Sequence, residues 1–429
     1  MNLPSRYPFH YGWVVVIAGA LVVFVNSSLF LTFAVFLEPI SQATGWSRAE
    51  VSGAYALHWM VGAVAVFGIG WFTDRFGTRS ALLIGSLLTA ISLTLAGRAT
   101  ALWQLYLFYG VLFGIARSSF LVPVHLVVGM WFRKKLGLAM GIVNISLALG
   151  PLALSAPLRY LIDIVGWGNT LLIAGIAGAV LMALCSWFIR NQPRDLGLKP
   201  YGEDETNVAV SKPKPQRRPL FYRADTPNFF NYAAKTQPFV LLILIHFLGC
   251  LSHSIPLTHI VAMATDAGIA PIAAATILSL MSAFNMASSF GSSILADVAG
   301  GKKALGLALL LQASGILILL GTKDLWMFYI FALVFGLGYG GEMVAFPIIN
   351  RQYYGAASIG KVYSAQMVGA GLGMAGGAYL GGILFDLAGN YTWAIWAGAI
   401  IGYLGFLTVL RLVSPFAPPT TESKPSGAG

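Results

Sequence analysis

Two ionisable side chains lie in the middle of long apolar stretches, and they are the first candidates for chemistry. Arg117 follows Gly114 by one helical turn, and Glu342 follows Tyr339 by three residues. A guanidinium offers a planar pair of donors that matches a carboxylate, and a glutamate can hold or release a proton. If these stretches cross a membrane, each charge costs about 2.5–3.5 kcal/mol at the centre and needs a partner or a watery cavity. We therefore expect Arg117 to bind an anion and Glu342 to couple a proton. The alternative is a fixed salt bridge between them.

Histidines on a third apolar stretch extend this set. His246, Cys250 and His253 are spaced i, i+4 and i+7, so they share one face of a helix. Imidazole titrates near neutral pH, and His253 is nearest the middle of its stretch, so we expect it to carry a coupling proton. A neutral histidine bonded to a neighbouring helix is the alternative. Because that face holds no carboxylate, we predict no metal site.

Neutral polar residues in the remaining stretches are candidates for the walls of a substrate cavity. They are Tyr339, Asn26, Ser118, Asn285 and Gln366. Hydrogen bonds between helices are the alternative use of such side chains, and for a serine the more common one.

The elements that position these residues are apolar throughout. Of 429 residues, 57% are hydrophobic and 10% are charged, whereas soluble domains carry about 25% charged residues. About 20 apolar residues are needed to cross a bilayer. The sequence predicts an all-α, polytopic membrane protein with twelve such spans, at 12–37, 50–73, 80–97, 102–130, 137–161, 168–189, 238–264, 271–296, 304–321, 325–349, 360–385 and 391–412.

A polar segment divides the spans into two halves of six. We predict an N-terminal half at 1–189, a cytoplasmic linker without packed structure at 190–237, a C-terminal half at 238–413 and a disordered cytoplasmic tail at 414–429. A shift of 223 residues lays Asp74 on Asp297, Gly77 on Gly300 and Arg79 on Lys302. Two parallel six-helix repeats are typical of transporters, with the substrate near the midplane between them.

Basic residues set the expected orientation. Most Lys and Arg residues fall in the segments on one side of the spans, together with both termini and the linker, and that side is predicted to be cytoplasmic. The net charge of +11 then reflects membrane orientation, and no nucleic-acid partner is expected. The sequence has no phosphate-binding Gly-x4-Gly-Lys motif, so we expect neither an ATP-driven pump nor another enzyme. No cofactor is predicted, and we expect a monomer in an inner membrane.

The short loop 70–79 resembles the motif between the second and third helices of the major facilitator superfamily. Its sequence is GWFTDRFGTR, and 297–303, DVAGGKK, resembles a degenerate copy. The resemblance implies a latch in which an acid at one helix end and a cation across the bend hold helices together in one conformer. The gating candidates are Asp74, Arg75, Arg79, Asp297 and Lys302.

A finer resemblance covers nearly the whole chain. Segments 11–13 (YGW), 45–48 (GWSR), 131–141 and 194–200 (RDLGLKP) are similar to the bacterial oxalate/formate antiporter and monocarboxylate transporter branch. That branch moves small carboxylates by exchange or with a proton. Its members commonly anchor the carboxylate with an arginine in the eighth helix, and the oxalate exchanger adds a lysine in the eleventh. Here the eighth span has no cation and Gln366 falls near the position of that lysine, which argues against oxalate.

The residues and the resemblance together predict a secondary transporter of a small organic anion. A monocarboxylate such as lactate or pyruvate, moved with a proton or in exchange for another anion, is the favoured substrate. The alternative is a proton-coupled exporter of drugs or other small molecules, which would use Glu342 and carry lipophilic cations.

Overall fold

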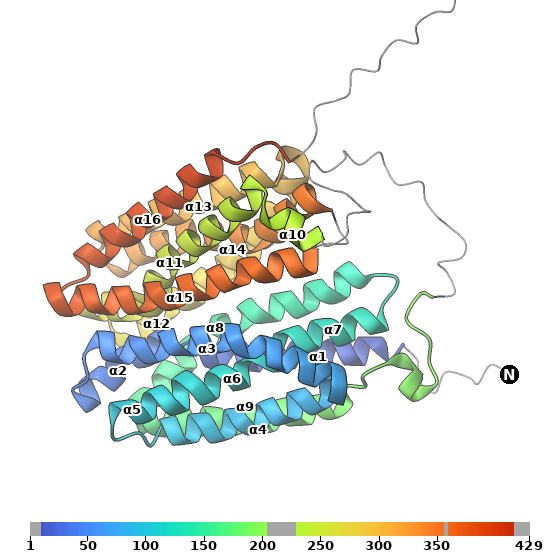
Figure 1. Cartoon of the computed structure of the whole chain (residues 1–429). Helices are drawn as coiled ribbons and strands as arrows, with labels where there is room; N and C mark the ends of the chain where they lie inside the picture. Colours follow the sequence, from blue (N-terminus) through green and yellow to red (C-terminus); the bar gives the residue numbers. More distant parts are fainter. Residues whose placement is uncertain (1–9, 204–228, 356–358, 416–429) are drawn as a thin grey trace, which may run out of the picture.

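The computed structural model describes residues 10–203, 229–355 and 359–415, with the side chains of Asp297 and 359–361 outside the described part. It is almost entirely helical (Figure 1). The helices of the N-terminal half are α1 (Gly12–Phe30), α2 (Ala34–Thr44), α3 (Arg48–Phe76), α4 (Thr78–Ala96), α5 (Leu102–Leu105), α6 (Phe113–Ser118), α7 (Leu121–Trp131), α8 (Leu136–Val165) and α9 (Trp167–Phe188). Those of the C-terminal half are α10 (Phe229–Ala234), α11 (Gln237–Asp266), α12 (Pro271–Ala299), α13 (Gly301–Ile318), α14 (Leu325–Tyr354), α15 (Ile359–Ala388) and α16 (Thr392–Leu410).

Twelve helical segments in the described residues are long and apolar enough to cross a membrane, which confirms the predicted spans. The first consists of α1 and α2 together, Gly12–Thr44, and the fourth of α5 to α7, Leu102–Trp131. Helices satisfy all their backbone hydrogen bonds internally, so apolar stretches of this length fold as helices in lipid.

The fourth span is not one continuous α-helix, and one of its breaks lies next to Arg117. A π-helix, Tyr106–Leu112, joins α5 to α6, and the helix breaks again at Ser119 and Phe120. Pro123 has no N–H to donate to the carbonyl of Ser119, so the regular ladder cannot continue through this point. Arg117 therefore lies in the last turn of α6, directly before the break.

Two bundles form the molecule, with α1–α9 in one and α10–α16 in the other (Figure 1). They meet mainly through α3 against α15 and α8 against α12, with α2 against α11. Glycines allow the backbones to approach: a Cβ on Gly382 would lie 2.6 Å from Cα of Ala49, and one on Gly371 would lie 2.8 Å from Cβ of Ala63.

One end of the interface between the halves is held by charge. The Arg48 guanidinium donates two hydrogen bonds of 2.6 Å to the Asp266 carboxylate and lies 3.9 Å from the ring centre of Phe385. The backbone N–H groups of Arg48 and Ala49 donate to Asp386 at 3.2 and 2.9 Å, so that carboxylate caps the N-terminus of α3. We call Arg48, Asp266 and Asp386 the Arg48 cluster.

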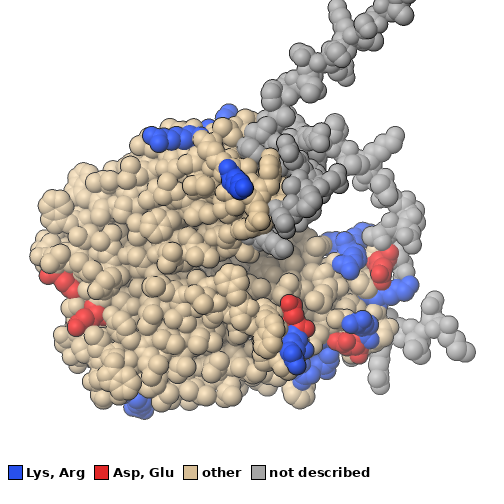
Figure 2. All heavy atoms as spheres, viewed as in Figure 1, with Lys and Arg blue, Asp and Glu red and all other residues tan. Residues whose placement is uncertain are grey.

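The opposite end of the interface, from which the linker leaves, is not joined in this way. Among the described residues, the other hydrogen bonds between the halves join Thr265 to Glu38, next to the Arg48 cluster, and Ser279 to the carbonyl of Pro151. Figure 2 shows a hollow between the halves toward the linker end, where most of the visible Lys and Arg side chains also gather. The halves are thus closed together at the Arg48 end and parted at the linker end.

The first part of the predicted linker is ordered, in contrast to the expected unstructured segment. Residues 190–203 fold back onto the end of α7 and include a short 3₁₀-helix, Pro193–Leu196. Trp131 donates its indole N–H to the carbonyl of Arg190 at 2.9 Å, and Tyr201 donates its backbone N–H to the Trp131 carbonyl at 2.8 Å. These backbone partners could not be read from composition. Residues 204–228 lie outside the described part.

Candidate functional site

The Arg117 guanidinium lies among aromatic rings. Its central carbon is 4.2 Å from the ring centre of Trp59 on α3 and 4.7 Å from that of Phe30 on α1. Such contacts stabilise a cation through the negative faces of the rings. A Cβ on Gly62 would lie 2.6 Å from the Nη2 atom, so the glycine makes room for the guanidinium.

Arg117 has no acidic partner among the described residues. It forms no ion pair with them, and its Nε is buried without a hydrogen-bond acceptor. The faces of the guanidinium are packed while its donors remain available. This is the arrangement expected of a cation that receives a carboxylate from outside the protein.

Other buried polar atoms on the same helices are also unsatisfied within the described residues. They are Nδ2 of Asn26, both ring nitrogens of His58, Nε1 of Trp59 and the hydroxyl of Tyr109. Asn26 lies one turn from Phe30 on α1, and the His58 ring packs between Phe30, Tyr55, Tyr109 and Phe113. Each unsatisfied buried group costs about 1–3 kcal/mol. A concentration of them around one cation marks a polar site within an otherwise apolar bundle.

Glu342 lies in a second polar network, within the C-terminal half. Its Oε2 accepts a hydrogen bond of 2.6 Å from the Gln312 amide on α13, and Nδ1 of His253 on α11 is 3.1 Å away. Oε1 is buried without a hydrogen-bond partner. A Cβ on Gly249 would lie 2.4 Å from Oε1, so α11 can approach the carboxylate only with glycine at that position.

The two acceptors beside His253 fix the position of one proton. The Gln312 amide donates to Glu342 through its nitrogen, so its oxygen faces Nδ1 of His253 at 3.0 Å. Nδ1 therefore faces two acceptor oxygens and must carry a hydrogen. Nε2 is 3.2 Å from the sulfur of Met374, a weak acceptor that suits either a bare or a protonated nitrogen.

Sequence reasoning missed part of this network. Gln312 brings a side-chain amide into the middle of a predicted apolar span, which was a usable signal. The ligand atoms of Cys250, His253 and Glu342 lie within 4.8 Å of one another, so a carboxylate from α14 joins the α11 face that appeared to lack one. These residues could hold a metal ion. In the structure, however, Glu342 and His253 are bonded to each other and to Gln312, as in a proton-sharing pair.

Trp59 connects the two networks. It packs against the buried cluster of Cys250, Ala370 and Met374 while its ring contacts Arg117. Tyr339 packs edge-on against His253, with ring centres 4.9 Å apart. The predicted cation and acid therefore lie near the interface between the halves, but Trp59 and Met374 stand between them and they form no salt bridge with each other.

Three of the predicted cavity residues have packing contacts. Ser118 donates its hydroxyl to the carbonyls of Gly62 and Gly114 at 3.1 and 3.0 Å. Gln366 exchanges two amide hydrogen bonds, of 2.8 and 2.9 Å, with Asn350. In this conformer Ser118 and Gln366 thus make hydrogen bonds between and within helices, the alternative use of such side chains, and their contact with substrate stays a prediction. At Asn285, α12 packs against Gly340, where a Cβ would lie 2.1 Å from the Asn285 carbonyl oxygen.

Two of the predicted gating residues, Arg79 and Lys302, hold helices together within their own half. The Arg79 guanidinium lies 4.1 Å from the ring centre of Trp187 at the end of α9, and Lys302 donates to the carbonyls of Leu410 and Leu412 at the end of α16. Arg79 and Lys302, which the repeat aligns, thus each contact the end of the last membrane helix of their own half.

Asp74 forms no latch between helices with the described residues in this conformer. Asp74 is exposed and forms no ion pair within the described residues, and Arg75 lies over Trp71 and Phe76 of its own helix. The side chain of Asp297 lies outside the described part.

Comparison with known proteins agrees with this architecture. Residues 16–250 and 242–429 match the family model described as Major Facilitator Superfamily. Monocarboxylate transporter 13 of Bos taurus is 28% identical over 96% of this chain and 92% of its own length, and the oxalate:formate antiporter of Oxalobacter formigenes is 25% identical over 42% of each. A D-xylose-proton symporter (TM-score 0.75, 11% identity, covering 94% of this chain and 98% of that one) shares the fold. So does an inward-facing bacterial homologue of the lysosomal transporter Spinster (TM-score 0.72, 14% identity, 96% and 100%). The chain belongs to the Major Facilitator Superfamily and is a secondary membrane transporter.

Proposed function

We propose that the protein transports a monocarboxylate together with a proton by alternating access. Arg117 binds the carboxylate through its guanidinium donors, and the substrate occupies the interface beside Trp59 and Tyr339. The observation that carries the proposal is a partly buried guanidinium whose Nε is buried without an acceptor and which has aromatic neighbours and no acidic partner in the described residues. Two relatives, a monocarboxylate transporter and an oxalate:formate antiporter, point by name to the same class of substrate.

Because Arg117 is the single cation of the proposed site, the site favours a substrate with a single carboxylate. Among the described membrane segments, buried Arg159 pairs through Nη2 with Asp163 at 3.0 Å, so its charge is balanced by that carboxylate, although its Nε and Nη1 have no hydrogen-bond partner there. A dicarboxylate such as oxalate would bring a second charge for which this part of the chain offers no free cation.

Glu342 and His253 are proposed to carry the coupling proton. The carboxylate and the imidazole share one hydrogen-bonded unit with Gln312. Met374, whose sulfur is 3.2 Å from Nε2 of His253, packs against Trp59, and the Trp59 ring contacts Arg117. Binding of an anion at Arg117 would favour protonation of the unit, so that substrate and proton cross together. This network supports symport over exchange of one anion for another.

The linker end is proposed to be cytoplasmic, with the protein in an inner membrane and both termini on the cytoplasmic side. The basic residues at that end support this orientation. The conformer is then closed outside by the Arg48 cluster and open inward. The bundles 1–189 and 238–413 would rock against each other about the substrate, connected by 190–237, with 414–429 as a tail.

Uptake into proteoliposomes tests the proposal. Labelled lactate, pyruvate, formate and oxalate are offered with and without an inward-acid gradient, and we expect the gradient to accelerate one of the first three. Loss of a charge-assisted bond worth about 1.5–3 kcal/mol should raise the KM of Arg117→Lys and Arg117→Ala by about 10- to 100-fold. The matched control is Arg98→Ala, an exposed arginine of the outer face.

Two results would contradict the proposal. One is wild-type uptake by folded Arg117→Ala protein. The other is transport of lipophilic cations with no response to any carboxylate, which would favour an exporter.

A further inference from the structure

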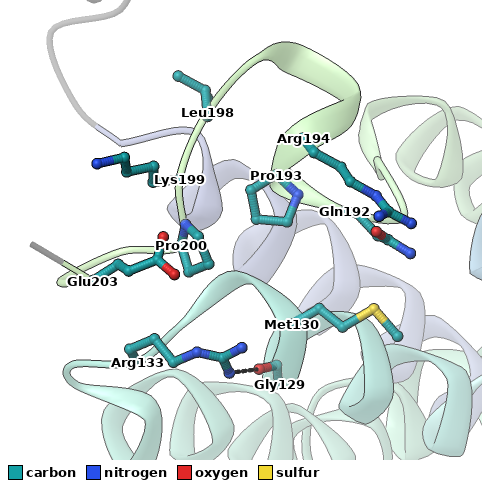
Figure 3. A pocket seen from close by; sticks show the side chains of 10 residues that line it. All are labelled: Gly129, Met130, Arg133, Gln192, Pro193, Arg194, Leu198, Lys199, Pro200 and Glu203. Carbon is teal, nitrogen blue, oxygen red and sulfur yellow. Dashed lines mark hydrogen bonds between the residues drawn. The ribbon is translucent and has the colours of Figure 1, made fainter.

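A separate cavity lies at the linker end of the N-terminal half. Its volume is about 590 Å³, and it lies as an open hollow between the end of α7 and the ordered segment 192–203 (Figure 3). Arg133 and Met130 line it from α7, and Arg194, Lys199 and Glu203 line it from the segment. None of these residues belongs to the Arg117 site or to the Glu342 network.

The lining is strongly basic. The lining residues include three cations, Arg133, Arg194 and Lys199, and one carboxylate, Glu203, which is a formal net charge of +2. Arg133 makes one long bond of 3.5 Å to the Gly129 carbonyl, and the Arg194 side chain forms no hydrogen bond or ion pair with other described residues. Guanidinium donors in a hollow of this charge are suited to phosphate oxygens.

The cavity is built into the fold. Tyr201 pairs with the chain after α7, where Arg133 donates its backbone N–H to the Tyr201 carbonyl at 3.0 Å. Phe132 is fully buried and packs against the Tyr201 ring, with centres 5.5 Å apart. Pro193 and Pro200 restrict the backbone of the lining segment. The backbone that carries the cations is therefore fixed beside the hollow.

The cavity also adjoins a lipid-facing surface. The last turn of α9, just before the lining segment, exposes 62% of Trp187 and 54% of Phe188, and Met130 in the lining is 42% exposed. Aromatic residues concentrate at the level of the lipid headgroups, and basic pockets at the cytoplasmic ends of membrane helices bind anionic headgroups. A soluble phosphate would use the cations but not this apolar border.

We propose that this cavity binds the headgroup phosphate of an anionic phospholipid, with the acyl chains lying along Met130 and the exposed end of α9. The bound lipid connects α7 to the first ordered part of the linker. This site is independent of the proposed substrate.

Native mass spectrometry of the purified full-length protein in detergent tests the inference. The protein is titrated with phosphatidylglycerol, with phosphatidylcholine, or with inorganic phosphate. The wild type should retain phosphatidylglycerol in preference to phosphatidylcholine, and Arg133→Gln/Arg194→Gln should weaken the retention at least fivefold. Lys303→Gln/Arg351→Gln removes two exposed cations from the same end of the other half and should leave retention unchanged.

The outcomes distinguish a lipid headgroup from a soluble phosphate as the ligand of the cavity. Equal retention of the two lipids, or equal retention by the two double variants, overturns the site. Displacement of phosphatidylglycerol by millimolar inorganic phosphate would show a soluble anion site and overturn the lipid assignment. Circular dichroism and size-exclusion profiles of both double variants identify any failure to fold, and the single variant Arg194→Gln, whose side chain is exposed, then replaces the double variant.

Discussion

Replacing Arg48 by glutamine should shift the transporter away from the conformer closed at the Arg48 end. The substitution removes two hydrogen bonds of 2.6 Å to Asp266, between side chains that are 12% and 37% exposed, and the stacking on Phe385. The backbone bonds from Arg48 and Ala49 to Asp386 remain, because they do not need the side chain.

The size of the shift follows from the exposure of this pair. A fully buried charged pair loses several kcal/mol when broken, whereas an exposed pair contributes about 0–1 kcal/mol. The bidentate geometry and the partial burial place this pair between those limits, at about 1–2 kcal/mol. That energy changes the ratio of outward-closed to outward-open molecules by about 5- to 30-fold.

Electron–electron distance measurements can detect this change. Spin labels at Ala43 and Leu387, both exposed at the Arg48 end, report the separation of the halves there, in a background with Cys185 and Cys250 replaced by alanine. Arg48→Gln should populate a longer distance, Arg48→Lys should do so less, and Arg98→Gln should not. An unchanged distance distribution in Arg48→Gln would refute the role of the Arg48 cluster as the contact that closes this end.

Three further outcomes are expected. Glu342→Gln should keep counterflow of the substrate but lose acceleration by an inward-acid gradient, and a wild-type pH profile of uptake would exclude this carboxylate from coupling. Gly62→Ala would place a Cβ 2.6 Å from Nη2 of Arg117, so the KM for the carboxylate should rise with little change in thermal stability; an unchanged KM would contradict the location of the binding site. Asn350→Leu removes both hydrogen bonds that Asn350 exchanges with the buried Gln366 amide, so it should lower the free energy of unfolding by about 1–3 kcal/mol. Thermal denaturation in detergent measures this loss. Adding Gln366→Leu should recover part of it, and no recovery would show that the unpaired amide is not the cause.

The twelve spans were predictable because length and apolar composition alone decide which segments can cross a bilayer. The repeat was informative as well: Arg79 and Lys302, matched by the shift between the halves, dock equivalent helix ends. The ordered segment after α9 was not predictable, because its stability comes from backbone bonds to Trp131 and from the rings around Tyr201.

The candidate site was predictable only in part. The spacing of Cys250 and His253 indicated a shared face, but the rotation of α13 and α14 that brings Gln312 and Glu342 to it depends on packing across helices. For the same reason we predicted from the sequence that Arg117 lies beside Glu342, whereas the structure has Trp59 between them. An ionisable residue within an apolar span can be identified from the sequence as a candidate site residue. The side chains that it contacts can be identified only from the tertiary structure.

The break in the fourth span has an electrostatic consequence. The helical run that begins at Leu102 ends at Ser118, so its last turn, with carbonyls left without an intrahelical donor, surrounds the base of Arg117. The aligned peptide dipoles place about half a negative charge at such a terminus, and they stabilise a nearby cation by up to about 2 kcal/mol. This partial counter-charge is part of the backbone and moves with the N-terminal half. If Arg117 binds the substrate as proposed, this partial counter-charge stays beside the guanidinium when the ligand leaves.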